Sequence, residues 1–231
     1  MLNIAGFEKI SLIDYPGKLS SIVFTYGCNL RCEYCHNPEL VVEPLKEDRL
    51  LDEEKILKYL GSRSKKLDAV VITGGEPLLY YKELLVFAKK IKKLGYLVKL
   101  DTNGLLPSRL QSLIKSKSID YISMDIKYPE AGYVLYTGAD TLEKVKESIK
   151  IIMNSGIEYE FRTTYVKGIH DTNSSAGIGE LINGADLYFI QNFRPGKTIN
   201  ATLSAQNSFT EKELRKLKKT VKPYVENVEI R

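Results

Sequence analysis

The sequence is poor in several features that would point to common protein classes. It has only three cysteines and no apolar run near the roughly 18 residues that a membrane span requires. No basic, apolar leader with a small-residue cleavage site is evident. We expect no disulfide, because the cytosol is reducing and an odd cysteine count leaves one thiol unpaired. We therefore expect a cytoplasmic protein that does not associate with a membrane.

A concentrated basic stripe is missing too, although the formal net charge is +5. The lysines and arginines gather on predicted helices, where they form solvated faces. We therefore expect no nucleic-acid partner. There is no internal repeat, linker or low-complexity tract, and 231 residues with 43% apolar content suit one α/β domain of barrel type.

Short β-branched runs alternate with longer amphipathic stretches along the chain. Strands are expected at Ser21–Thr25, Ala69–Thr73, Leu97–Asp101, Tyr121–Asp125, Tyr159–Val166 and Leu187–Gln191. Helices are expected at Asp52–Arg63, Lys82–Leu94, Ser108–Ser116, Leu142–Asn154, Ala176–Asn183 and Thr210–Val221. The alternation predicts βαβ units with a parallel sheet. Six units fall short of a complete barrel, so the expected fold is α/β, an incomplete (β/α)6 barrel.

The expected organisation is a single domain over residues 1–231. Its parts are an N-terminal extension over 1–18, a barrel core over 19–192, and a C-terminal helix and strand over 193–231. The extension carries a turn signal at Tyr15-Pro16-Gly17, and the tail Asn227–Arg231 reads as a last short strand.

All three cysteines lie in one loop, Cys28-Asn29-Leu30-Arg31-Cys32-Glu33-Tyr34-Cys35-His36. The loop follows the first predicted strand directly, at the strand end where parallel barrels carry their chemistry. The Cys-x3-Cys-x2-Cys spacing lets one loop wrap three corners of a cuboidal iron–sulfur cluster, whose irons prefer thiolate ligands. Three cysteines for four irons leave one iron open to a small molecule.

Three other interpretations of this loop remain. The cysteines and His36 could form a structural zinc site, although such sites usually lie on paired, separated knuckles. The stretch Cys32–His36 also spells the Cys-x-x-Cys-His haem-attachment string, which is typical of exported proteins. Plain core cysteines are less consistent with a loop that is otherwise polar.

Polar residues also mark the ends of later strands. Thr73-Gly74-Gly75-Glu76-Pro77 is either a tight turn or a place where backbone approaches a ligand. Alternation groups polar side chains on one face of each of three strands: Lys99, Asp101 and Asn103; Ser123, Asp125 and Lys127; Glu160, Arg162 and Thr164. Buried ionisable residues are usually paired or functional, so these faces predict a polar lumen suited to a zwitterionic ligand. Were they to face outward, helices would cover the same charges.

Together these motifs resemble the radical S-adenosylmethionine (SAM) superfamily, and within it the activating enzymes of glycyl-radical enzymes. The resemblance rests on Cys28…Cys32…Cys35-His36-Asn37, Gly74-Gly75-Glu76-Pro77, Leu100-Asp101-Thr102-Asn103-Gly104 and Met124-Asp125-Ile126-Lys127. It covers roughly Gly6 to Asp171. The opening, Gly6-Phe7-Glu8-Lys9 through Asp14-Tyr15-Pro16-Gly17, is most similar to activating proteins of anaerobic ribonucleoside-triphosphate reductase. Pyruvate formate-lyase activating enzyme is a further relative.

The resemblance implies a radical SAM oxidoreductase in which Cys28, Cys32 and Cys35 hold a 4Fe-4S cluster. A flavodoxin- or ferredoxin-type donor would reduce the cluster. SAM would then be cleaved to a 5′-deoxyadenosyl radical that takes a hydrogen from a glycine Cα of a partner glycyl-radical enzyme. No catalytic side chain is implied beyond the cluster and SAM.

The resemblance also assigns ligand contacts. Tyr34 and His36 would flank the adenine, Gly74 and Gly75 would meet the amine, and Lys127 and Arg162 would steady SAM. The full implied set of cofactor-binding residues is Tyr34, His36, Gly74, Gly75, Glu76, Asp101, Asn103, Asp125, Lys127, Arg162 and Asn192. A monovalent-cation site is implied at Asp101, Thr102 and Asp125. Two alternatives remain: a radical SAM enzyme acting on a small molecule or another peptide, and a zinc-binding module.

Overall fold

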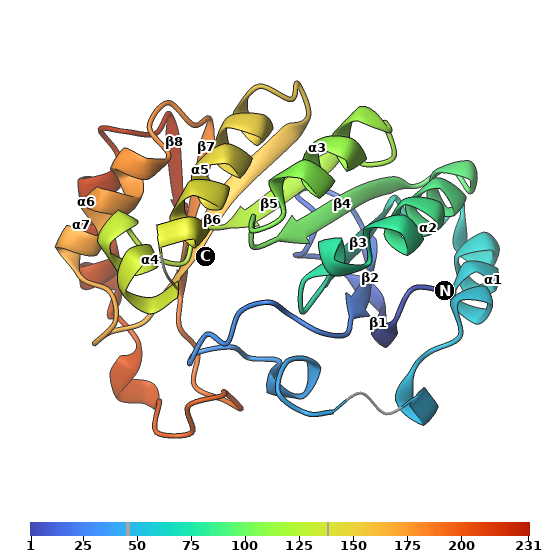
Figure 1. Cartoon of the computed structure of the whole chain (residues 1–231), viewed down its shortest axis with the longest axis horizontal. Coiled ribbons are helices and arrows are strands. Elements are labelled where there is room, and N and C mark those ends of the chain that lie inside the picture. The colour runs from blue at the N-terminus through green and yellow to red at the C-terminus, as the bar shows by residue number, and fades with distance from the viewer. Residues whose placement is uncertain (45–46, 138) are drawn as a thin grey trace. The chain divides into compact units, whose positions relative to one another are not determined.

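The computed structural model describes residues 1–44, 47–137 and 139–231 (Figure 1). Its strands follow one another in the sheet order β1-β2-β3-β4-β5-β6-β7-β8. β1 (Ile4–Ser11) pairs antiparallel with β2 (Ser20–Thr25), and β2 pairs parallel with β3 (Ala69–Gly74). The α/β fold with a mostly parallel sheet is therefore confirmed. None of the described helices is long and apolar enough to cross a membrane.

The chain forms two compact units. The N-terminal unit comprises Met1–Arg31, Glu39–Thr102 and Ser108–Ile122. The C-terminal unit comprises Cys32–Pro38, Asn103–Pro107 and Ser123–Arg231. The expected single domain stays a prediction.

After β3, the N-terminal unit continues with β4 (Leu97–Thr102), which pairs parallel with β3. Its helices and short 3-10 turns are α1 (Glu53–Arg63), α2 (Tyr81–Lys93), α3 (Pro107–Lys115), η1 (Pro38–Leu40), η2 (Glu47–Arg49) and η3 (Pro77–Tyr80). β5 (Tyr121–Asp125) begins in this unit and ends in the other. Helices α1 and α2 pack against each other (Figure 1).

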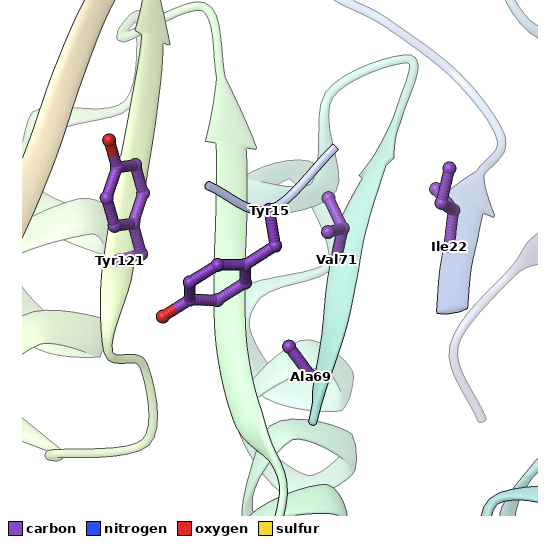
Figure 2. Close-up of a cluster of buried hydrophobic side chains, with 5 residues drawn as sticks. All are labelled: Tyr15, Ile22, Ala69, Val71 and Tyr121. Carbon is purple, nitrogen blue, oxygen red and sulfur yellow. The ribbon is translucent and has the colours of Figure 1, made fainter. Parts of the chain in front are cut away.

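The core of the N-terminal unit explains why the turn after β1 is fixed. Figure 2 shows a cluster of buried side chains from this turn, β2, β3 and β5: Tyr15, Ile22, Ala69, Val71 and Tyr121. The Tyr15 and Tyr121 rings lie 5.4 Å apart between centroids. Burying two such rings is a large hydrophobic contribution. The Tyr15-Pro16-Gly17 turn is therefore anchored in the core.

The C-terminal unit holds a parallel run of strands, β6 (Glu158–Tyr165), β7 (Leu187–Asn192) and β8 (Asn227–Ile230). Its helices and 3-10 turn are α4 (Glu130–Thr137), α5 (Ala139–Met153), α6 (Thr172–Leu181), α7 (Glu211–Val221) and η4 (Ala205–Asn207). α6 and α7 lie side by side (Figure 1). A capping box between Thr210 and Glu213 fixes the start of α7.

The six predicted strands and six predicted helices are all present, close to their predicted bounds. The short terminal strand is present as β8. Besides the short 3-10 turns, one strand and one helix of the described residues were not predicted. The extension over 1–18 contains β1, paired to β2, and the segment Glu130–Thr137 is a helix, α4.

Candidate active site

The cysteine loop begins directly after β2 in the N-terminal unit. Cys28 is partly exposed, and none of the three cysteines forms a disulfide. The Leu30 N–H lies 3.4 Å from the Cys28 Sγ, and the Arg31 guanidinium donates to the Cys28 carbonyl at 2.6 Å. A backbone N–H directed at sulfur favours the thiolate form, which is the form that binds metal. Cys28 is therefore held in a local environment that suits a thiolate ligand.

The Gly-Gly-Glu turn after β3 packs on the backbone that leads into this loop. A Cβ on Gly75 would lie 1.9 Å from the Gly27 carbonyl oxygen, and one on Gly74, at φ +119°, would lie 2.3 Å from the Thr25 nitrogen. The Glu76 N–H donates to that same Gly27 oxygen at 2.7 Å. Only glycine tolerates such an approach and such a φ. The turn therefore fixes the residues immediately before Cys28.

Two strand ends of the N-terminal unit carry buried polar groups. The fully buried Glu76 carboxylate accepts from the Leu78 N–H at 3.0 Å and from the Thr102 hydroxyl at 2.9 Å. On β4, the Lys99 Nζ lies 3.0 Å from Asp101 Oδ1. The polar face of β4 is therefore buried, with Lys99 and Asp101 as an ion pair, and the lumen for a zwitterionic ligand stays a prediction.

Cys32 and Cys35 belong to the C-terminal unit, where the Cys35 N–H donates to the Cys32 carbonyl at 3.0 Å. Burial raises the pKa of the Cys32 thiol, while the positive charge of Lys127 opposes that rise. A nearby cation or a bound metal is what converts such a thiol to its thiolate form. Burial of Cys32 therefore favours the thiol, whereas the charge of Lys127 favours the thiolate.

The centre of this environment is the Asp125 carboxylate at the end of β5. The Arg162 Nε lies 2.9 Å from its Oδ1 and the Lys127 Nζ lies 3.2 Å from its Oδ2. Burial acts to raise the pKa of the Asp125 carboxyl, but the charges of Arg162 and Lys127 hold it well below its usual range. Burial acts to lower the pKa of the Lys127 ammonium, but Asp125 and Cys32 raise it above its usual value. The Asp125 carboxylate is therefore held in its charged form between two cations.

Two residues that were not predicted hold the Lys127 backbone. His170 Nδ1 accepts from the Val166 N–H at 3.1 Å, so Nε2 carries the proton and donates to the Lys127 carbonyl at 2.9 Å. The Tyr133 hydroxyl accepts from the Lys127 N–H at 2.8 Å. The predicted Tyr34 also reaches this point, with its hydroxyl 3.5 Å from the Lys127 carbonyl. In the sequence, the signal for a residue that holds the Lys127 backbone was the histidine just after β6, His170.

His36 is placed by the segment after β7. Its Nε2 lies 2.8 Å from the Arg194 carbonyl oxygen, and its ring stacks on Phe193 at 5.4 Å. Phe193, 1% exposed, was not among the predicted site residues. The predicted Asn192 uses its amide to bond the Phe209 backbone in both directions, at 2.8 and 2.9 Å. Asn192 thus holds the following segment in place.

Other predicted residues make contacts within the C-terminal unit. Asn103 Oδ1 accepts from the Leu105 N–H at 3.0 Å, which fixes the turn after β4. Ser123 donates to the buried Glu160 at 3.0 Å, and Glu160 is paired with Arg231 at 3.2 Å. These contacts account for one of the charges on the predicted polar faces, that of Glu160.

Among residues 1–44, 47–137 and 139–231, no group of three or more His, Cys, Asp or Glu side chains is arranged to hold a single metal ion. The three cysteines nevertheless lie on one short loop, each is partly exposed, and none forms a disulfide. A donor set of three thiols fits an iron–sulfur cluster better than a hard cation such as Mg²⁺. The residues present therefore fit the predicted cluster.

Sequence comparison places these features among known proteins. The family model described as the Radical SAM superfamily matches residues 22–175. A relative from Methanocaldococcus jannaschii, named as a glycyl-radical enzyme activating enzyme, is 35% identical over 99% of this chain and 95% of its own length. The pyruvate formate-lyase-activating enzyme of Clostridium pasteurianum is 30% identical over 79% of this chain and 76% of its own.

Comparison with solved structures supports the fold. Streptococcus suis SuiB bound to S-adenosylmethionine aligns with a TM-score of 0.65 at 16% identity, over 91% of this chain and 51% of that one. A domain of a pyruvate-formate lyase-activating enzyme from Bacteroides vulgatus aligns with a TM-score of 0.55 at 14% identity, over 71% of this chain and 99% of that one.

Proposed function

The chain belongs to the radical SAM superfamily and groups with the activating enzymes of glycyl-radical enzymes, and we propose that it generates a radical on a backbone glycine of a partner protein. The observation that supports this most is the 35% identity to a named activating enzyme over 99% of the chain. As a member of the superfamily, the enzyme uses a 4Fe-4S cluster and SAM.

We assign the cluster to Cys28, Cys32 and Cys35. Support comes from their spacing, from the absence of a disulfide at any of the three and from the positive charge of Lys127 near Cys32. With three thiolates on four irons, one iron is left for the amine and carboxylate of SAM. Once bound, the cluster and SAM supply a one-electron reductive cleavage whose product removes a hydrogen atom from a glycine Cα.

The residues of the chain bind and orient SAM in this proposal. Arg162 and Lys127 place two positive charges beside the Asp125 carboxylate, and cations of this kind attract a ligand carboxylate. The exposed His36, whose ring stacks on Phe193, offers an aromatic surface that suits adenine, and the buried Tyr34 packs edge-on against His170. His170 and Tyr133 hold the Lys127 backbone and so position its ammonium.

The finer assignment is to the anaerobic ribonucleoside-triphosphate reductase as the partner. It rests on the opening stretch Gly6 through Gly17, whose turn is anchored by the buried Tyr15. A flavodoxin- or ferredoxin-type protein is the proposed reductant. A reducing cytoplasm is the proposed location, since it preserves the three free cysteines.

The test is anaerobic reconstitution followed by electron paramagnetic resonance. Reduced enzyme, SAM and the large subunit of the anaerobic reductase should give a glycine-centred doublet. The same mixture with pyruvate formate-lyase in place of the reductase is the matched control for partner choice. A doublet only with pyruvate formate-lyase would move the assignment to that partner, and no doublet with either would reject both.

A further inference from the structure

Lys99 is a lysine that the chain buries almost completely. It lies on β4 and its side chain is 1% exposed. A lysine ammonium loses its hydration when it is buried, so such residues are rare unless they are paired. The contacts of Lys99 with Asp101, Asp14 and Tyr121 show which segments its ammonium connects.

The Lys99 ammonium joins two segments of the N-terminal unit. Its Nζ lies 3.0 Å from Asp101 Oδ1 and donates to the Asp14 carbonyl at 2.7 Å. It also lies 5.8 Å from the centroid of the Tyr121 ring. An ion pair, a carbonyl and an aromatic face together replace the lost hydration of the ammonium.

Asp101 is also where the family resemblance implies a monovalent cation, with Thr102 and Asp125 as further ligands. In this chain each of the two carboxylates already has a positive partner within its own unit. Lys99 neutralises Asp101, and Arg162 and Lys127 neutralise Asp125. The donor set therefore does not fit a free cation, because a second positive charge at Asp101 would be repelled by the ammonium.

We propose that the Lys99 ammonium replaces the monovalent cation at Asp101, so that this enzyme binds SAM without Na⁺ or K⁺. A tethered ammonium cannot dissociate, and its charge is present at every salt concentration. Lys99 is a positioning residue, because it acts through Asp101 and through the Asp14 segment. The proposal rests on the proposed function only in that SAM is the ligand.

The first experiment measures SAM binding to the anaerobically reconstituted enzyme by calorimetry, without reductant. Dissociation constants are compared in choline chloride, NaCl and KCl at equal ionic strength. The wild-type constant should agree within about twofold across the three salts, since the Debye screening is the same. A wild-type enzyme that binds SAM only with Na⁺ or K⁺ overturns the proposal.

The second experiment removes the Lys99 ammonium, so that a soluble cation can bind at Asp101 in its place. Lys99→Ala should weaken SAM binding at least about tenfold in choline chloride, because it leaves a buried carboxylate unpaired. Saturable recovery is expected with Na⁺, K⁺ or methylammonium, and the sodium NMR signal should broaden with this variant and not with the wild type. A merely structural role of Lys99 gives neither response.

The control is Lys90→Ala, which removes a lysine from the buried Glu53 carboxylate at 2.7 Å in the same unit. It should show no dependence on the cation. If Lys99→Ala does not fold or load iron, Lys99→Met takes its place. A folded, iron-loaded variant that ignores all three cations overturns the proposal. None of these measurements needs the partner protein, so a failed glycine-radical assay with intact SAM binding rejects the proposed function alone.

Discussion

Two carboxylates, one in each compact unit, are neutralised in different ways. Asp101 in the N-terminal unit meets one ammonium, that of Lys99, and the two side chains are 7% and 1% exposed. Asp125 in the C-terminal unit meets two cations, and its side chain is 20% exposed. The first pair is almost fully buried, whereas the second group is partly open and places two cations beside one carboxylate.

This difference in exposure indicates that the two groups have different roles. A fully buried ion pair can fix two segments but offers no exposed charge to a ligand. A partly open group with two cations can attract an anion. We therefore expect the SAM carboxylate to depend directly on Arg162 and Lys127, and Lys99 to act on SAM binding only through Asp101 and the Asp14 segment.

The largest effect should come from the cysteines, which both units share. Replacing Cys28 or Cys35 with Ala should remove the cluster and with it all SAM cleavage, because a cluster with two thiolates is not retained. Iron and sulfide analysis after anaerobic reconstitution measures this. A Cys35→Ala variant with a full cluster that responds to SAM would show that the ligand assignment is wrong.

The next effect concerns the closed pair. Lys99→Met should lower the free energy of unfolding by about 3–5 kcal/mol, because it leaves the Asp101 charge buried and unpaired. The double variant with Asp101→Asn should recover much of this loss. Denaturant unfolding of the four members of the cycle gives the coupling between the two sites. Simple additivity would contradict a pair that acts as one unit.

The open group predicts a binding effect with little loss of fold. Arg162→Ala should weaken SAM binding about tenfold while the iron content stays near that of the wild type, since charged hydrogen bonds contribute roughly 1.5–3 kcal/mol. The control is Arg215→Ala, which breaks the exposed pair with Glu211. Equal SAM affinity in the Arg162 and Arg215 variants would place Arg162 outside the ligand site.

The smallest effect is a pH dependence from His170. Burial lowers the pKa of its imidazole, with Asp171 and its backbone partners opposing and Lys127 contributing to the decrease. The unfolded chain then binds more protons below pH ~6.5, so stability should fall as pH falls through that value, by at most about 1.4 kcal/mol per pH unit. His170→Gln should flatten this slope when unfolding is measured between pH 7.5 and about 5.5. An unchanged slope would show that another group carries the dependence.

Local pattern was sufficient for the elements and for the cysteine loop. Period and turn residues located strands such as Ala69–Gly74, and thiol spacing located the cluster loop, because both signals lie within a few neighbouring residues. Helix α4 was not predicted, because Tyr133-Val134-Leu135-Tyr136 is rich in aromatic and branched residues that also suit a strand.

The partners of the charged residues could not be predicted in the same way. Alternation indicated that Lys99 and Asp101 share a face, but the Asp14 carbonyl is 85 positions from Lys99 in sequence. His170 likewise reaches the Lys127 carbonyl 43 positions away. Such contacts follow from how strands and loops meet in three dimensions, which a single sequence does not encode as a local period.

The most direct test of the account follows the hydrogen atom. With deuterium on the α-carbon of the partner's glycine, reduced enzyme and SAM should give 5′-deoxyadenosine that carries deuterium, in proportion to the glycine radical formed. If SAM is cleaved but no deuterium transfers from the partner, and a small metabolite donates the hydrogen instead, the enzyme is not an activating enzyme.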